Sequence, residues 1–341
     1  MTSTSARIVI KAWGFLSKRR GLYLFKLLLT FALLSGLIFY LRSHDLLAAF
    51  RQVRHSAIVL ACALLPLNLG LQFLKWHYLL RSATGQPLAP RLSFFSLLAG
   101  FPLGLLTPGR WGELGRALFL PQLHERRVMV LAAFDKVFDL FLGMLLGAFA
   151  LLYLIIKEML PQVLLGPVVV LLCCFVWLNV LVLQPRALKG LTRILYKRRA
   201  TKRSTLRVLT RISRQNLCVV WLISFLFVLT YSLQFVLLLR GFVAISFFEG
   251  YIGGSAAFLV KSLLPIALGD LGVREGAAAF FFARMGLSPQ AAFDAGLRLF
   301  IFNLLAPSLL GTILIWKYQT TARRAKLDFA ASGLNESFRI E

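Results

Sequence analysis

The chain has 341 residues, of which 59% are hydrophobic, and its mean hydropathy is +0.78. This composition is typical of a polytopic membrane protein and excludes an ordinary soluble domain. The formal charge of +26 would suit a nucleic-acid-binding protein, but the basic residues cluster beside apolar segments. We therefore attribute the charge to membrane topology and expect no nucleic acid as a partner.

Six apolar segments are each long enough to cross a bilayer, which takes about 20 residues. They are residues 22–41, 57–80, 128–156, 163–184, 217–240 and 291–316. We expect the first to be a retained span, since it is too long for a signal-peptide core and lacks a convincing cleavage site. The sequence therefore predicts one all-α membrane domain over residues 21–320, without a soluble catalytic domain, between cytoplasmic tails 1–20 and 321–341.

Two further apolar segments, 92–120 and 251–283, are interrupted midway by Pro and Gly. The expected hinge residues are Pro108, Gly109 and Gly112 in the first segment and Pro265, Gly269 and Gly272 in the second. Irregular backbone survives at membrane depth only where it is buried in protein or faces water. We expect both segments to re-enter, leaving by the side they entered. The alternative is that both cross fully, which gives eight spans.

The chain also repeats itself, with repeat 1 at about 57–156 and repeat 2 at about 217–316. The matched motifs are Ala132–Asp135 with Ala291–Asp294, Gly109-x-x-Gly112 with Gly269-x-x-Gly272, and Leu71–Phe73 with Leu233–Phe235. If the broken segments re-enter, the first spans of the two repeats run in opposite directions. The repeats are then inverted, as in transporters whose binding site lies where the halves meet. If the segments cross fully, the repeats are parallel.

A basic loop, residues 185–216, separates the repeats. Eleven Lys/Arg and no acid lie within Pro185–Arg214. Positive residues favour the cytoplasmic side, so we place this loop and both termini in the cytoplasm. Polybasic segments beside spans attract anionic lipid by ~1 kcal/mol per charge, so we expect anionic lipids as partners of the loop.

Charged residues are also expected inside the membrane. The acids are Glu113, Asp135, Asp139, Asp270, Glu275 and Asp294, and the bases are Arg110, Arg116, Lys136, Lys261, Arg274 and Arg298. Each charge at the bilayer centre costs ~2.5–3.5 kcal/mol, so each needs a partner or water. Ion pairs that only hold helices together are one interpretation. We favour a hydrated site for an anionic group, because the charges gather at two repeat-related breaks.

Arginine is the natural ligand for such an anion, because its guanidinium fork matches phosphate oxygens. The acids would pair with the arginines when the site is empty, and proton exchange by Glu113, Asp135, Glu275 and Asp294 is an alternative role. The repeat alignment sets Asp139 against Arg298, which predicts a pair across the repeat axis. We expect no catalytic residue, no cofactor and no metal, since neither a nucleophile cluster nor metal-ligand spacing is found.

Three motifs carry a family resemblance. Pro108–Arg116 resembles the signature PG-x-x-GE-x-x-R, Pro265–Glu275 resembles P-x-x-x-GG-x-G-x-x-E, and Asp135–Asp139 resembles ER-x-x-D. These belong to the transmembrane domain of lysylphosphatidylglycerol synthases, which also occurs alone in flippase-like inner-membrane proteins. Two departures stand out: Asp270 replaces a Gly, and Asp135-Lys136 replaces Glu-Arg.

The resemblance implies a lipid-flippase domain with two re-entrant elements in a bacterial inner membrane. We expect it to move a phospholipid or polyprenyl-phosphate between leaflets, with the charged residues named above at the headgroup. The soluble aminoacyl-transferring domain is absent, so we expect no lysyl transfer. The alternatives are a membrane-embedded transferase in lipid-linked sugar or aminoacyl-lipid synthesis, and a partner that organises lipid-synthesis enzymes through its basic loop.

Overall fold

The computed structural model describes residues 55–107, 109–120, 122–187, 189–190, 208–267 and 269–318. Helices make up this part of the chain, and no strand is found in it. Five helices there are long and apolar enough to cross a membrane: Ser56–Thr84, Glu125–Ile156, Gln162–Val182, Arg214–Arg240 and Pro289–Tyr318. The protein is therefore an all-α polytopic membrane protein, as predicted. The expected span 22–41, the expected tails and most of the basic loop lie outside the described residues.

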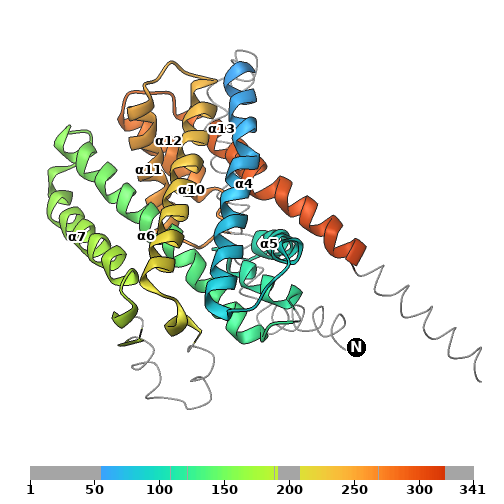
Figure 1. The fold of residues 1–341 in the computed structure, drawn as a ribbon. Coiled ribbons are helices and arrows are strands. Elements are labelled where there is room, and N and C mark those ends of the chain that lie inside the picture. Colours follow the sequence, from blue (N-terminus) through green and yellow to red (C-terminus); the bar gives the residue numbers. More distant parts are fainter. Residues whose placement is uncertain are drawn as a thin grey trace, which may run out of the picture.

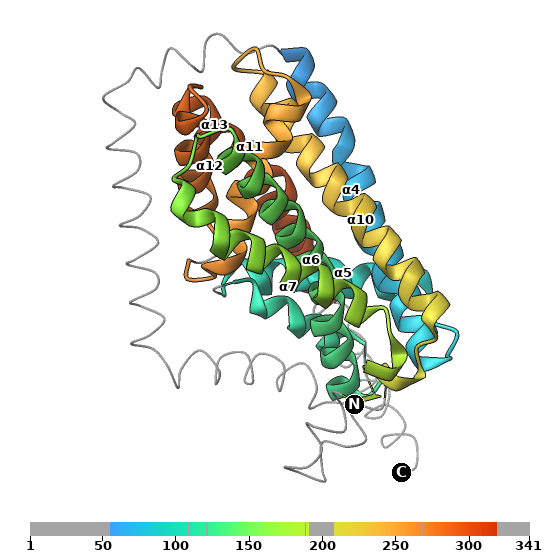
Figure 2. The same cartoon turned by 90° about the vertical axis from the view of Figure 1, so that its left-hand side faces the viewer.

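The first helices of the two repeats, α4 (His55–Thr84) and α10 (Arg214–Arg240), lie side by side (Figures 1 and 2). Near one end Gln234 Nε2 donates to the carbonyl of Ala61 at 2.9 Å, and near the other Tyr78 Oη donates to Asn216 Oδ1 at 2.9 Å. Residues early in α4 thus lie beside residues late in α10, and residues late in α4 lie beside residues early in α10. The two helices are antiparallel, which is the relation that inverted repeats require.

The first broken segment forms a helical hairpin of α5 (Pro90–Leu105) and the 3₁₀ helix η1 (Trp111–Phe119). Glycines allow the two arms to touch: a Cβ added to Gly100 would lie 3.2 Å from Arg116 Cβ, and one added to Gly104 would lie 2.6 Å from Glu113 Cγ. Later residues of α5 thus contact earlier residues of η1. The chain therefore reverses direction at the break.

The second broken segment repeats this arrangement with α11 (Phe247–Leu263) and α12 (Val273–Arg284). A Cβ on Gly253 would lie 2.5 Å from the Phe282 ring, so the start of α11 packs against the end of α12. Both arms begin with a capping interaction, in which Glu249 and Glu275 each accept a backbone N–H three residues back. These caps fix where each arm starts.

The last helix of each repeat packs on the hairpin of the other. In the first, α6 (Glu125–Ile156), Tyr153 stacks edge-on against Phe248 of α11 with ring centroids 5.1 Å apart. In the second, α13 (Pro289–Phe300) continues through a π turn, η5 (Ile301–Leu305), to Tyr318, whose ring lies 5.3 Å from Phe95 of α5. The last helix of each half therefore packs against the hairpin of the other half. The remaining span, α7 (Leu165–Val182), lies outside α6 (Figure 2).

Candidate functional site

The two breaks share an unusual backbone. Gly109 and Arg110 have φ of 59° and 58°, and their repeat mates Gly269 and Asp270 have 58° and 62°. A residue with a Cβ reaches this left-handed region only at a cost, which is smaller for Asp than for most residues. Consecutive left-handed residues in both halves show that the repeat extends to the backbone conformation. Pro108 lies outside the described residues.

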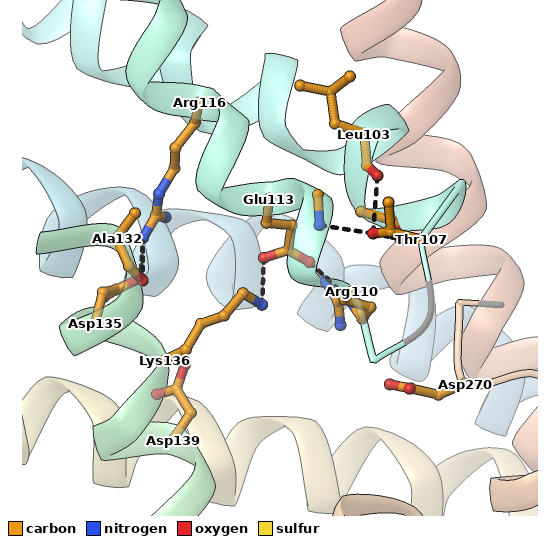
Figure 3. Close-up of polar contacts among 12 residues, drawn as sticks. Leu103, Thr107, Arg110, Glu113, Arg116, Ala132, Asp135, Lys136, Asp139 and Asp270 are labelled. Carbon is orange, nitrogen blue, oxygen red and sulfur yellow. Dashed lines mark hydrogen bonds and ion pairs between the residues drawn. The ribbon is translucent and has the colours of Figure 1, made fainter. Parts of the chain in front are cut away.

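The tips of the two hairpins meet. A Cβ added to Gly109 would lie 2.8 Å from Cβ of Pro265, and one added to Gly269 would lie 3.2 Å from Leu105 Cδ1. Asp270 extends toward the region of Arg110 (Figure 3), and its charge acts on that guanidinium. The repeat mates Arg110 and Asp270, opposite in sign, thus face each other across the junction of the halves.

A cluster of five charges, whose three cations are partly exposed, surrounds this junction. Glu113 joins two cations, with Oε1 2.5 Å from Arg110 Nε and Oε2 2.6 Å from Lys136 Nζ (Figure 3). The side chains of Arg110 and Lys136 are 22% and 30% exposed, so an incoming group can reach them. On the other hairpin Lys261 Nζ lies 3.5 Å from Asp270 Oδ2. We call these five residues the junction cluster, and it has one positive charge in excess.

Directly behind it lies a second cluster of four charges, which we call the inner cluster. Three of them are buried, and the side chain of Asp139 is 28% exposed. Lys75 Nζ of α4 lies 3.1 Å from Asp135 and 2.6 Å from Asp139, both on α6. Arg116 Nη2 of η1 donates to Asp135 Oδ2 at 2.7 Å, and its guanidinium lies 3.7 Å from the centroid of the Trp76 ring. Two cations and two anions balance, so this cluster ties α4 and η1 to α6.

Lys75 was not among the charged residues expected inside the membrane, and it changes the expected partner of Asp139. Asp139 was expected to pair with Arg298 across the repeat axis, whereas both of its carboxylate oxygens accept from Lys75. Asp294, one turn away on the same helix, acts on the charge of Arg298. A signal existed: Lys75 is a lone charge deep in an apolar span, where a cation needs an internal partner.

In the second half of the molecule, three charged residues are buried in an arrangement that differs from the inner cluster. Arg274 pairs with Glu275 next to it and donates to Tyr231 Oη at 3.1 Å. Glu275 is fully buried and also accepts from the N–H of Gly272 at 2.7 Å. Asp294 is 3% exposed, and its Oδ2 has no hydrogen-bond partner among the described residues.

The arginines expected at the headgroup therefore differ in how exposed their side chains are. Arg116 and Arg274 are 2% and 4% exposed and already bind carboxylates, so they hold the helices in place. Arg110 remains reachable, and it is joined by Lys136 and Lys261. No group of three His, Cys, Asp or Glu that could hold a metal occurs in the described part of the chain.

The fold and the junction cluster define a polytopic membrane protein with charged residues where two inverted halves meet. A sequence profile of the lysylphosphatidylglycerol synthase TM region matches residues 24–311, so the chain belongs to this family. No curated protein and no solved structure matches the chain. Membership of this family supports a function related to membrane lipids.

Proposed function

We propose that the protein is a lipid flippase of the bacterial inner membrane, which moves a lipid with an anionic phosphate headgroup between leaflets. The observation that supports this most directly is the junction cluster itself. It carries excess positive charge, is partly exposed, and lies where the hairpin tips of the two halves meet. The inner cluster differs in having balanced charge and three side chains that are almost fully buried, as expected of ion pairs that hold helices together.

The headgroup phosphate would compete with Glu113 for its two cations. Arg110 would offer a guanidinium fork and Lys136 a point charge, and both lie within reach of one group because one carboxylate already bridges them. Charge-assisted hydrogen bonds of this kind are stronger than neutral ones. Loading the lipid would exchange one anion for another, so no cation in the cluster is ever left without a partner.

The hairpins would supply the movement. Under this proposal α5–η1 and α11–α12 re-enter the membrane from opposite faces, and their tips separate in turn to open the junction cluster to one side and then the other. Left-handed residues at Arg110 and Asp270 place the strain of the backbone at the point that must move. The protein would need no catalytic residue, since no bond of the lipid changes.

The test uses purified protein in phosphatidylcholine vesicles with a trace of fluorescent phosphatidylglycerol, whose outer-leaflet fraction is read by chemical quenching. Wild type is expected to bring the inner-leaflet probe to the outside. Arg110→Gln and Lys136→Gln should each slow this movement by about 10- to 100-fold, because one charge-assisted contact is worth ~1.5–3 kcal/mol.

Arg284→Gln is the matched control, since Arg284 is exposed at the end of α12, away from the cluster. It should move lipid at the wild-type rate. Wild-type rates in both junction variants, with thermal unfolding unchanged, would remove the headgroup site from the junction cluster. Absence of movement with wild type itself would refute the flippase.

A further inference from the structure

One buried acid lacks the compensation that its repeat mate receives. Asp135 in α6 accepts from Arg116 and lies 3.1 Å from Lys75. Asp294, its mate in α13, is 3% exposed, and the structure shows no ion pair or hydrogen bond for its Oδ2 within the described ranges. A buried ionised carboxylate without partners is costly, and protonation is the usual way to avoid that cost.

The repeat alignment shows which residues of the second half stand in place of Arg116 and Lys75. In the register of Gly109-x-x-Gly112 and Gly269-x-x-Gly272, which covers the same hairpin, the position of Arg116 is occupied by Gly276. In the register of Leu71–Phe73 and Leu233–Phe235, the position of Lys75 is occupied by Leu237. Both cations that neutralise the first acid are therefore replaced by uncharged residues, Gly276 and Leu237.

Within the described residues, Asp294 has no ion pair to another helix. Helix α12 brings Arg274 and Glu275, which pair with each other. Helix α10 brings Tyr231, whose hydroxyl accepts from Arg274, and η5 carries no titratable group. On α13 itself Arg298 acts on Asp294 from one turn away, while its guanidinium lies over the Phe242 ring at 4.5 Å.

We propose that Asp294 is a proton-binding carboxyl that loads and releases one proton in each transport cycle, so that lipid movement is coupled to the proton gradient. The inference rests on the proposed flippase for its coupling part and on burial alone for its proton-binding part. A proton taken from water on one side would protonate the carboxylate, travel with the headgroup, and return to water on the other side. One proton with one anionic headgroup makes the transported charge neutral, which lowers the cost of crossing.

Proton binding is tested first, by infrared pH-difference spectra of detergent-solubilised protein. Wild type should show the carbonyl band of a protonated carboxyl, and Asp294→Asn should lose it. Glu158→Gln, which changes an exposed loop acid, should keep it. An unchanged band in Asp294→Asn would overturn the proposal. If that variant does not fold, Asp294→Glu should shift the band, and a band left in place would overturn the proposal equally.

Coupling is tested in the phosphatidylcholine vesicles with trace fluorescent phosphatidylglycerol and the membrane potential clamped at zero. A pH difference of about one unit should shift the steady-state leaflet ratio of the probe about tenfold for one coupled proton. Asp294→Asn should give the same ratio with and without the gradient, whatever its rate. A wild-type ratio that ignores the gradient would refute coupling while leaving the flippase intact. If wild type moves no lipid, the coupling falls with the flippase, and the infrared spectra still decide on proton binding.

Discussion

Lys75 shows what a single residue contributes inside the membrane. It is 1% exposed, and its ammonium binds the carboxylates of Asp135 and Asp139. Removing one member of such a group leaves the others buried without compensation, which costs far more than the group as a whole contributes. The inner cluster is therefore a structural requirement, distinct from the junction cluster in front of it.

A double-mutant cycle tests this distinction. Lys75→Met should lower the free energy of unfolding in detergent by ~3–5 kcal/mol, because two acids lose their shared cation. The double variant Lys75→Met with Asp139→Asn should recover much of the loss. Lys157→Met, at an exposed helix end, is the control and should have little effect. Additive losses in the double variant would show that Lys75 and Asp139 do not depend on each other.

At the scale of elements, the hairpins depend on glycine for close contact and not only for backbone freedom. Gly112 lies where any Cβ would collide with the carbonyl oxygen of Leu103, so the two arms of α5–η1 can approach this closely only because residue 112 is glycine. Thr107 reinforces the turn, accepting from Gly112 N at 2.6 Å while donating to Leu103 O at 3.1 Å.

Gly112→Ala should therefore force the hairpin apart. We expect a loss of ~1–3 kcal/mol in stability, as for other overpacked sites, together with slower lipid movement. Gly70→Ala and Gly143→Ala are matched controls, because nothing lies within 4 Å of an added Cβ at either position. These two should be as stable as wild type or more so. Equal melting temperatures for all three variants would contradict the close contact at Gly112.

At the scale of the whole molecule, hydropathy alone predicted every span that the structure describes, because about 20 apolar residues have few other uses. The Pro and Gly interruptions also predicted the two breaks. The inverted order was predicted on the condition that the broken segments re-enter, and the antiparallel α4 and α10 support that order. Ion-pair partners could not be predicted the same way. Asp139 is aligned with Arg298 by the repeat, yet its partner Lys75 comes from a third helix whose rotation only packing decides.

The sequence also could not show which arginine is exposed and which is buried. Arg110 and Arg116 stand in one motif, but the 3₁₀ turn directs Arg116 behind η1 onto Trp76 and leaves Arg110 at the tip. Which of them a headgroup reaches depends on exposure, and exposure depends on how both halves close around the junction. The site was thus predictable as a region and not as a set of ligands.

Tying the hairpin tips together tests directly whether lipid passes between them. Trp111 and Pro265 both lie against Gly109, within 3.3 Å and 2.8 Å of its would-be Cβ. Cysteines at these two positions, in a chain with Cys62, Cys173, Cys174 and Cys218 replaced, can be joined by a short reducible cross-linker. If lipid passes where the tips separate, cross-linking should stop movement of fluorescent phosphatidylglycerol, and reduction should restore it. The two single-cysteine variants should be indifferent to the reagent. Unchanged lipid movement in fully cross-linked protein would contradict the account.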